Sequence, residues 1–171
     1  METLAKHRSI FLLVVFALIF SCKRKNNDLE IFAHFKNSAA TILVDTTAYK
    51  KTTAKRIFGS HTAVSFDRLK VKKQYTRGAR AMAYYSILLE DIQTQTKVCR
   101  WLAERNGALF FDDTTSINQG MEQIYICCTG TNDCEPSLFV SEGKLFWTCG
   151  EKPSCSNPEK SCKISKTVLL D

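Results

Sequence analysis

Six cysteines lie within 36 residues toward the C-terminal end of this 171-residue chain. No two of them are separated by two residues, the spacing with which structural zinc sites and iron–sulfur clusters usually begin. In an oxidising compartment, such density predicts a set of disulfides that stabilises a segment rich in loops. The candidates can pair in many ways, so the connectivity stays open; they are Cys127, Cys128, Cys134, Cys149, Cys155 and Cys162.

The first residues of the chain have the layout of an export signal. A basic stretch, Lys6–Arg8, precedes an unbroken apolar run from Ile10 to Phe20, and this run ends at Ser21 and Cys22. Its length suits the core of a signal peptide, which has roughly 7–15 apolar residues, whereas a membrane-spanning helix needs roughly 20. We therefore expect export to a compartment in which disulfides persist.

The sequence Ile19-Phe20-Ser21-Cys22 resembles the lipobox of bacterial lipoproteins, with an aliphatic residue three positions before the cysteine and a small residue immediately before it. With the lysines and arginine that follow, it is most similar to lipoprotein signals of the Bacteroidetes. The resemblance implies cleavage before Cys22 and acyl chains on that residue, which anchor a protein without a membrane span. It also implies a cell-envelope protein that faces the periplasm or the cell surface, with the outer membrane favoured. An ordinary secretory signal and an uncleaved anchor are the alternatives.

The mature part of the chain is long enough for one domain with a hydrophobic core. We interpret residues 1–21 as the signal, 22–28 as a polar tether and 29–171 as a single domain, of which the part from 127 to 162 carries most cysteines. Near its start, Leu29–Phe35 and Thr41–Val44 suit strands. Thr46–Arg56 suits a polar helix capped by Thr46 or Thr47, and a further strand is expected over 62–71.

The segment from 81 to 102 repeats its apolar residues at alternating spacings of four and three, which predicts a helix. The stripe consists of Ala81, Tyr85, Leu88, Ile92, Gln95, Cys99 and Leu102. Asn106-Gly107 would end this helix. From Ala108 onward the pattern changes to short runs typical of strands, and Glu142-Gly143 suits a hairpin turn. We therefore expect an α+β fold, one helical stretch followed by a small antiparallel sheet held by disulfides.

Positive charge is concentrated in the first half of the mature chain. Between Cys22 and Arg80 there are 14 lysines and arginines against 4 acidic residues, and from Ala81 to Asp171 there are 8 against 12. Near a lipid anchor, basic residues gain about 1 kcal/mol per charge at an anionic surface. Attraction of nucleic acid is an alternative, and a solvated basic face needs no partner at all. We expect the membrane surface, with an envelope protein or a glycan, as the partner in preference to nucleic acid.

Lipidation of Cys22 leaves an odd number of cysteines, and Cys99 lies far upstream of the others. We expect Cys99 to be a free thiol that packs as a small hydrophobic side chain, with a reactive thiol as the alternative. Adjacent Cys127 and Cys128 would point to opposite faces of a strand, which favours two separate partners.

Candidates for catalysis are few. Asp112 and Asp113 follow an apolar run, where acids can act on a sugar or hold a cation, and His61 follows a serine, but no nucleophile motif accompanies them. No phosphate-binding loop, dinucleotide fingerprint or zinc-protease helix is present, so we expect no cofactor. The aromatic residues suit either the core or a ligand platform. We expect a binding or structural role, with an envelope hydrolase using Asp112, Asp113 or His61, or a cysteine-based metal or redox module, as alternatives.

Overall fold

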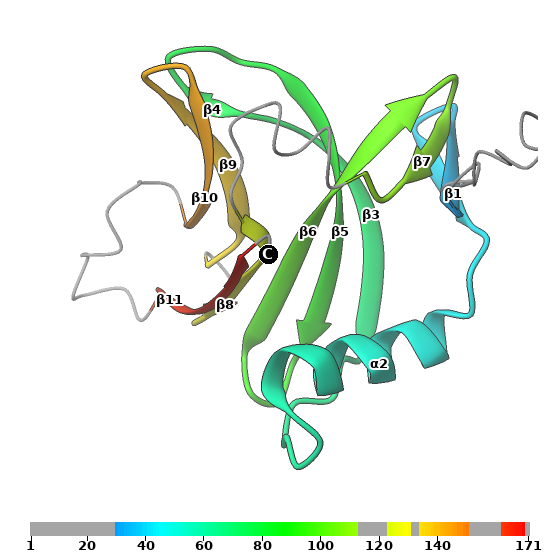
Figure 1. Cartoon of the computed structure of the whole chain (residues 1–171), viewed down its shortest axis with the longest axis vertical. Coiled ribbons are helices and arrows are strands. Elements are labelled where there is room, and N and C mark those ends of the chain that lie inside the picture. The colour runs from blue at the N-terminus through cyan, green and yellow to red at the C-terminus, as the bar shows by residue number, and fades with distance from the viewer. Residues whose placement is uncertain (1–29, 113–122, 131–133, 151–161, 170–171) are drawn as a thin grey trace, which may run out of the picture.

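The computed structural model describes residues 30–112, 123–130, 134–150 and 162–169, which form two β-sheets and one helix (Figure 1). The larger sheet contains β1 (Ile31–Lys36), β2 (Ala39–Ile42), β3 (Arg68–Tyr75), β5 (Ala83–Asp91), β6 (Thr96–Arg105), β7 (Ala108–Phe110), β8 (Gln123–Thr129) and β11 (Lys163–Leu169). The smaller sheet contains β4 (Arg77–Gly78), β9 (Pro136–Ser141) and β10 (Lys144–Cys149), and the helix is α2 (Thr46–Phe58). No helix in the described residues is both long and apolar enough to cross a membrane.

Strand β6 is the centre of the larger sheet. Along one side it pairs with β5 in antiparallel register, from Tyr85 opposite Leu102 to Asp91 opposite Thr96. Along its other side it pairs first with β8 and then with β7, so that two strands share one edge. The sheet therefore divides into two arms, with β1 and β2 beyond β7, and β11 beyond β8 (Figure 1).

Helix α2 begins where its first backbone N–H groups find an acceptor. The Asp45 carboxylate accepts hydrogen bonds from the N–H groups of Thr47 and Ala48 at 2.9 and 3.1 Å, so Asp45 is the N-cap. The predicted helix is confirmed, whereas the predicted cap at Thr46 or Thr47 is one or two residues too late. The helix ends at Gly59, whose positive φ of 91° suits glycine.

Both faces of the larger sheet are covered. One core lies between this sheet and α2 and includes Phe32, Ile57, Ile87, Leu89, Val98, Leu102 and Tyr125. The other lies between the opposite face and the smaller sheet and includes Tyr84, Cys99, Ile126, Leu138, Val140, Leu145 and Trp147. The larger sheet is thus the middle layer of three.

This double burial explains why the predicted helix over 81–102 is wrong. The segment forms β5 and β6, joined by a turn, so the fold is mostly β and the expected α+β architecture is incorrect. A strand buried on both faces carries apolar residues at consecutive positions and shows no alternation. Tyr85 packs in the core beneath α2, whereas Leu88, three residues later, is buried on the other face. The spacing of four and three is therefore not a helical stripe.

The predicted strands after Ala108 are confirmed as β7 to β11, although the strand predicted over 62–71 begins only at Arg68. The predicted hairpin turn at Glu142-Gly143 is also confirmed, since both residues have positive φ, 50° and 76°, between β9 and β10. Asn106-Gly107 has the same conformation, with φ of 54° and 80°. It joins β6 to β7 as a second hairpin turn and does not end a helix.

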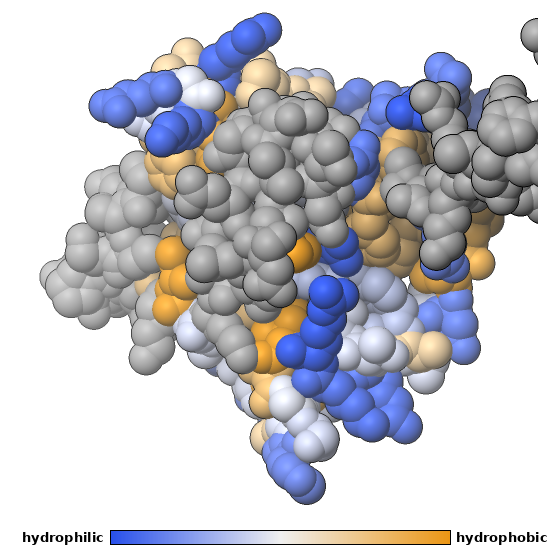
Figure 2. All heavy atoms as spheres, viewed as in Figure 1, coloured by the Kyte–Doolittle hydropathy of each residue, from blue (hydrophilic) through white to orange (hydrophobic). Residues whose placement is uncertain are grey.

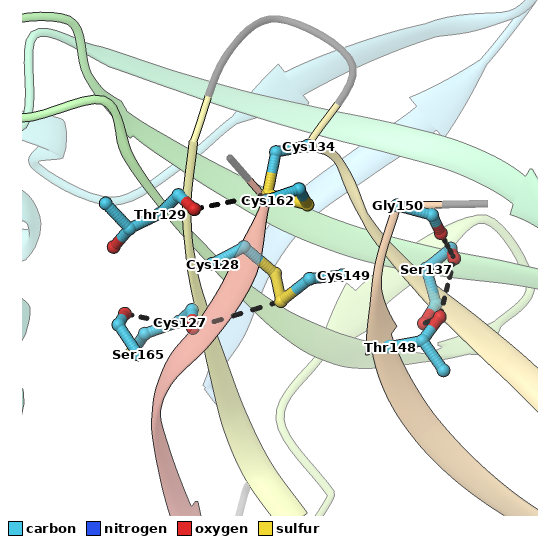
Figure 3. Close-up of a disulfide and its surroundings, with 10 residues drawn as sticks. All are labelled: Cys127, Cys128, Thr129, Cys134, Ser137, Thr148, Cys149, Gly150, Cys162 and Ser165. Carbon is cyan, nitrogen blue, oxygen red and sulfur yellow. Dashed lines mark hydrogen bonds between the residues drawn. A yellow bond between two sulfur atoms is a disulfide. The ribbon is translucent and has the colours of Figure 1, made fainter. Parts of the chain in front are cut away.

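Two disulfides lie on the smaller-sheet side of β8, Cys128–Cys149 and Cys134–Cys162 (Figure 3). The first joins β8 of the larger sheet to β10 of the smaller one, and the prediction of disulfides is confirmed for these four cysteines. Cys127 belongs to the core beneath α2, whereas Cys128 belongs to the other core, as expected for neighbours on a strand. Cys155 lies outside the described residues.

Candidate anion-binding cavity

Of the residues proposed for catalysis, the structure describes His61 and Asp112. His61 is exposed in the loop after α2, and Asp112 is half-buried directly after β7. Neither lines the cavity at the β5–β6 turn. Asp113 and Cys22 lie outside the described residues. The described part of the chain also contains no group of three or more His, Cys, Asp or Glu side chains placed to hold a metal ion.

A cavity of about 350 Å³ lies at the end of the larger sheet where β5 turns into β6. Its floor is a row of three residues that pair across neighbouring strands, Arg68 of β3 with Glu90 of β5, and Glu90 with Lys97 of β6. Pairing places all three on the same face of the sheet. The full lining comprises Arg68, Glu90, Asp91, Ile92, Gln95, Lys97 and Gly130.

The first disulfide lies beside this row. Cys128 of β8 pairs with Lys97 and therefore continues the row onto the next strand. Its bond to Cys149 holds the smaller sheet at this point (Figure 3). The smaller sheet covers the neighbouring part of the face, including Tyr84, Cys99 and Ile126. Beyond this covered part, the three residues of the row line the cavity.

The lining carries two cations, Arg68 and Lys97, and two carboxylates, Glu90 and Asp91. Lys70 Nζ lies 2.9 Å from Glu90 Oε2, so a lysine from β3 already neutralises this carboxylate. The Arg68 guanidinium is exposed and has no hydrogen-bond or ion-pair partner among the described residues. A guanidinium can donate two parallel hydrogen bonds to a carboxylate or a phosphate. Arg68 is thus the donor in this cavity that a bound anion would meet.

The other carboxylate of the lining, Asp91, is used to hold the turn. It accepts hydrogen bonds from the N–H groups of Ser65 at 2.9 Å, Gln93 at 2.9 Å and Thr94 at 3.1 Å. Burial raises the pKa of Asp91, but these hydrogen bonds outweigh it and lower the pKa below its ordinary value. Asp91 therefore stays ionised and acts as a structural anchor of the cavity wall.

The sequence contains no local signal for this site. The alternation of Arg68, Lys70 and Lys72 indicates one charged strand face, but Glu90 and Lys97 join it only through strand pairing. These two residues are 22 and 29 positions away from Arg68 in the sequence. Sequence reasoning therefore missed the site, because pairing register is set by the whole sheet.

The aromatic residues do not form one platform. Tyr84 and Trp147 pack edge to face in the core, with ring centres 6.1 Å apart. Phe111 lies beneath the Arg100 guanidinium, whose carbon is 3.8 Å from the ring centre. Phe139 and Phe146 form a half-buried pair with ring centres 5.4 Å apart. Because Trp147 is buried in the core, Phe146 is the member of this adjacent pair that faces away from it.

Cys99 is buried at the face covered by the smaller sheet and forms no disulfide in the structure. Burial raises the pKa of its thiol to about 12. Nucleophilic attack by cysteine requires the thiolate, so this environment favours a packing role over the reactive thiol considered from the sequence.

Comparison with known proteins identifies no relative of this chain. No protein-family model matches the chain, and neither curated proteins nor solved structures yield a match.

Proposed function

We propose that the protein is a lipid-anchored component of a bacterial cell envelope that binds a small anionic ligand in the cavity at the β5–β6 turn, without catalysis. The lipobox-like sequence at Ile19–Cys22 supports the anchor. The two disulfides support an oxidising compartment, since such bonds are rare where thiols are kept reduced.

The observation that carries the binding proposal is the row Arg68–Glu90–Lys97 on the cavity floor. The only carboxylate of this row belongs to Glu90, and it forms an ion pair with Lys70 of β3. The guanidinium of Arg68 therefore has no acidic partner among the described residues. The volume of about 350 Å³ lies at the lower end of the range for small-molecule sites. Ile92, of which 58% is exposed at the turn, adds an apolar contact. The ligand class is a small carboxylate or phosphate compound.

The carboxylates of the lining support binding in preference to catalysis. Glu90 is paired with Lys70, and Asp91 is fully occupied by backbone N–H groups. A general acid or base needs an available group that exchanges a proton near the working pH. Both carboxylates of the described lining are engaged within the protein, Glu90 by the Lys70 ammonium and Asp91 by backbone N–H groups.

The anchor is tested by metabolic labelling with an acyl-chain reporter in a bacterial host. We expect the protein to be labelled and the label to disappear in Cys22→Ala, while Cys99→Ala remains labelled. Labelling that survives Cys22→Ala would contradict the anchor.

The cavity is tested by thermal unfolding with three probes, inorganic phosphate, acetate and glucose 6-phosphate. A ligand that binds the folded state raises the melting temperature, and the rise grows with the logarithm of the ratio of ligand concentration to Kd once the site is largely occupied. We expect at least one probe to stabilise the protein, and Arg68→Gln to weaken its apparent affinity by about tenfold or more, because hydrogen bonds to charged groups contribute about 1.5–3 kcal/mol.

The matched control is Arg56→Gln, which removes the same charge from the exposed side of α2. This variant should retain the stabilisation by the probe. Equal losses in both variants would show a general effect of net charge, and no stabilisation by any probe would remove small carboxylates and phosphates as the ligand class.

A further inference from the structure

The loop between β3 and β5, residues Thr76–Met82, is exposed but firmly held; we call it the arginine loop. The buried Thr76 closes it, since its N–H donates to the Met82 carbonyl at 2.9 Å and its hydroxyl donates to the Arg80 carbonyl at 2.6 Å. The Met82 N–H donates a hydrogen bond to the Thr76 hydroxyl at 2.8 Å. Within the loop, β4 pairs in parallel with β9. The loop is therefore ordered before it meets any partner.

The arginine loop presents cations without counter-charges. Arg77 and Arg80 are exposed, and their guanidinium groups have no hydrogen-bond or ion-pair partner among the described residues. Lys144, the first residue of β10, is also exposed, and Glu142 is the acidic residue of the adjoining β9–β10 turn. Figure 2 shows hydrophilic side chains that stand out from this tip of the molecule.

An aromatic residue accompanies these charges. Tyr75, immediately before the loop, has 63% of its surface exposed, an unusual degree for so large a side chain. Arginine and lysine beside an exposed tyrosine is the combination found where proteins meet the head-group region of a bilayer. The tip projects outward (Figure 1) and so presents its charges to a broad surface.

The arginine loop and the anion-binding cavity are separate sites. Strand β5 begins beside the loop at Ala83 and ends in the cavity lining at Asp91. At about 3.3 Å per residue, this places the two sites roughly 26 Å apart along the strand. A substitution in the loop therefore leaves the lining of the cavity unchanged.

We propose that the arginine loop docks the domain onto anionic lipid head groups. Charge complementarity favours anionic lipid as the binding partner, because two unpaired guanidinium groups on a projecting tip match a plane of phosphate charges. Each basic residue near such a surface contributes about 1 kcal/mol, which is about fivefold in affinity. The rigid loop adds little ordering cost on contact. This docking needs no acyl chain, although the proposed anchor would hold the tip near a bilayer.

The test uses residues 22–171 with Cys22→Ser, which is the mature chain without acylation, and measures sedimentation with lipid vesicles. We expect binding to vesicles that contain phosphatidylglycerol, no binding to vesicles of phosphatidylcholine alone, and loss of binding as salt is raised. The variant R77Q/R80Q should bind about thirtyfold more weakly, and an unchanged melting temperature would show that it is folded. The charge-matched control K51Q/R56Q, on the exposed side of α2, should bind within about twofold of the parent.

A second measurement tests whether the loop itself contacts the lipid. Tyr75→Trp should show a larger blue shift of fluorescence on addition of anionic vesicles than the parent, which already contains Trp101 and Trp147, as the added indole enters the head-group region. Equal losses in the two double variants, binding without this larger blue shift, or absence of binding to anionic vesicles would each overturn the proposal. Equally tight binding of soluble dextran sulfate would overturn it in favour of a soluble polyanion. Each of these results is independent of acyl labelling at Cys22 and of probe binding in the cavity.

Discussion

A Cβ atom built on Gly78 would lie 2.3 Å from the carbonyl oxygen of Val140. Gly78 belongs to β4 and lies directly against β9, and its φ of +92° is unfavourable for other residues. Gly59, at the end of α2, has nearly the same φ of +91° but nothing within 4 Å of a Cβ. The two glycines thus separate the effect of backbone conformation from the effect of close approach.

We expect Gly78→Ala to lower the free energy of unfolding by about 2–4 kcal/mol, because β4 must move away from β9. Gly59→Ala should cost less than Gly78→Ala, about 1–3 kcal/mol, from its backbone conformation alone, because φ of 91° with ψ of 171° is essentially restricted to glycine. Urea unfolding of both variants measures the difference. Equal costs would contradict the close approach of β4 and β9.

The bridge Cys128–Cys149 joins the two sheets and closes a segment of 21 residues. We expect the double variant C128A/C149A to lose about 3 kcal/mol of unfolding free energy, because its unfolded chain is no longer restricted. The control is Cys99→Ala, which removes a buried sulfur without breaking a bridge. A double variant that is as stable as this control in urea unfolding would show that the bridge contributes little.

Asp91 should make stability depend on acid. Its pKa is lowered in the folded state, so its stabilising effect is complete above the unfolded value of about 3.9 and is lost as the pH falls through the lower, folded value. We expect Asp91→Asn to cost about 1–3 kcal/mol at pH 7, because the hydrogen bonds from Ser65, Gln93 and Thr94 lose their charged acceptor.

The same variant tests the direction of this dependence. Chemical unfolding at pH 7 and near pH 2 should show the difference between wild type and Asp91→Asn becoming smaller in acid. Glu142→Gln, in the exposed β9–β10 turn, serves as the control and should differ little from wild type at either pH. A difference for Asp91→Asn that grows in acid would contradict the sign.

Cys99 should be unreactive in the folded protein. With a pKa of about 12, almost none of its thiol is ionised at pH 8, and the side chain is only 1% exposed. We expect iodoacetamide to leave Cys99 unmodified in native buffer and to modify it in denaturant, as measured by peptide mass mapping. Rapid native modification at Cys99 would restore the reactive-thiol hypothesis.

Several local features of this fold are readable from the amino-acid sequence because their causes are local. The hairpin turn at Glu142-Gly143 requires two residues of positive φ, and only a few residue types adopt that conformation. The helix near Thr46 follows from a short polar segment after a capping residue, although the acceptor is Asp45. The cysteine density likewise predicts disulfides, whatever their pairing.

Only the tertiary structure determines that residues 81–102 form strands and which residues line the cavity. Leu88 and Cys99 lie on one expected helical stripe, yet they face each other across β5 and β6. Hydrophobic spacing records which side chains are buried, and a strand covered on both faces is buried at every position. Arg68, Glu90 and Lys97 form one row only because three strands pair in a particular register, which depends on the packing of both cores at once.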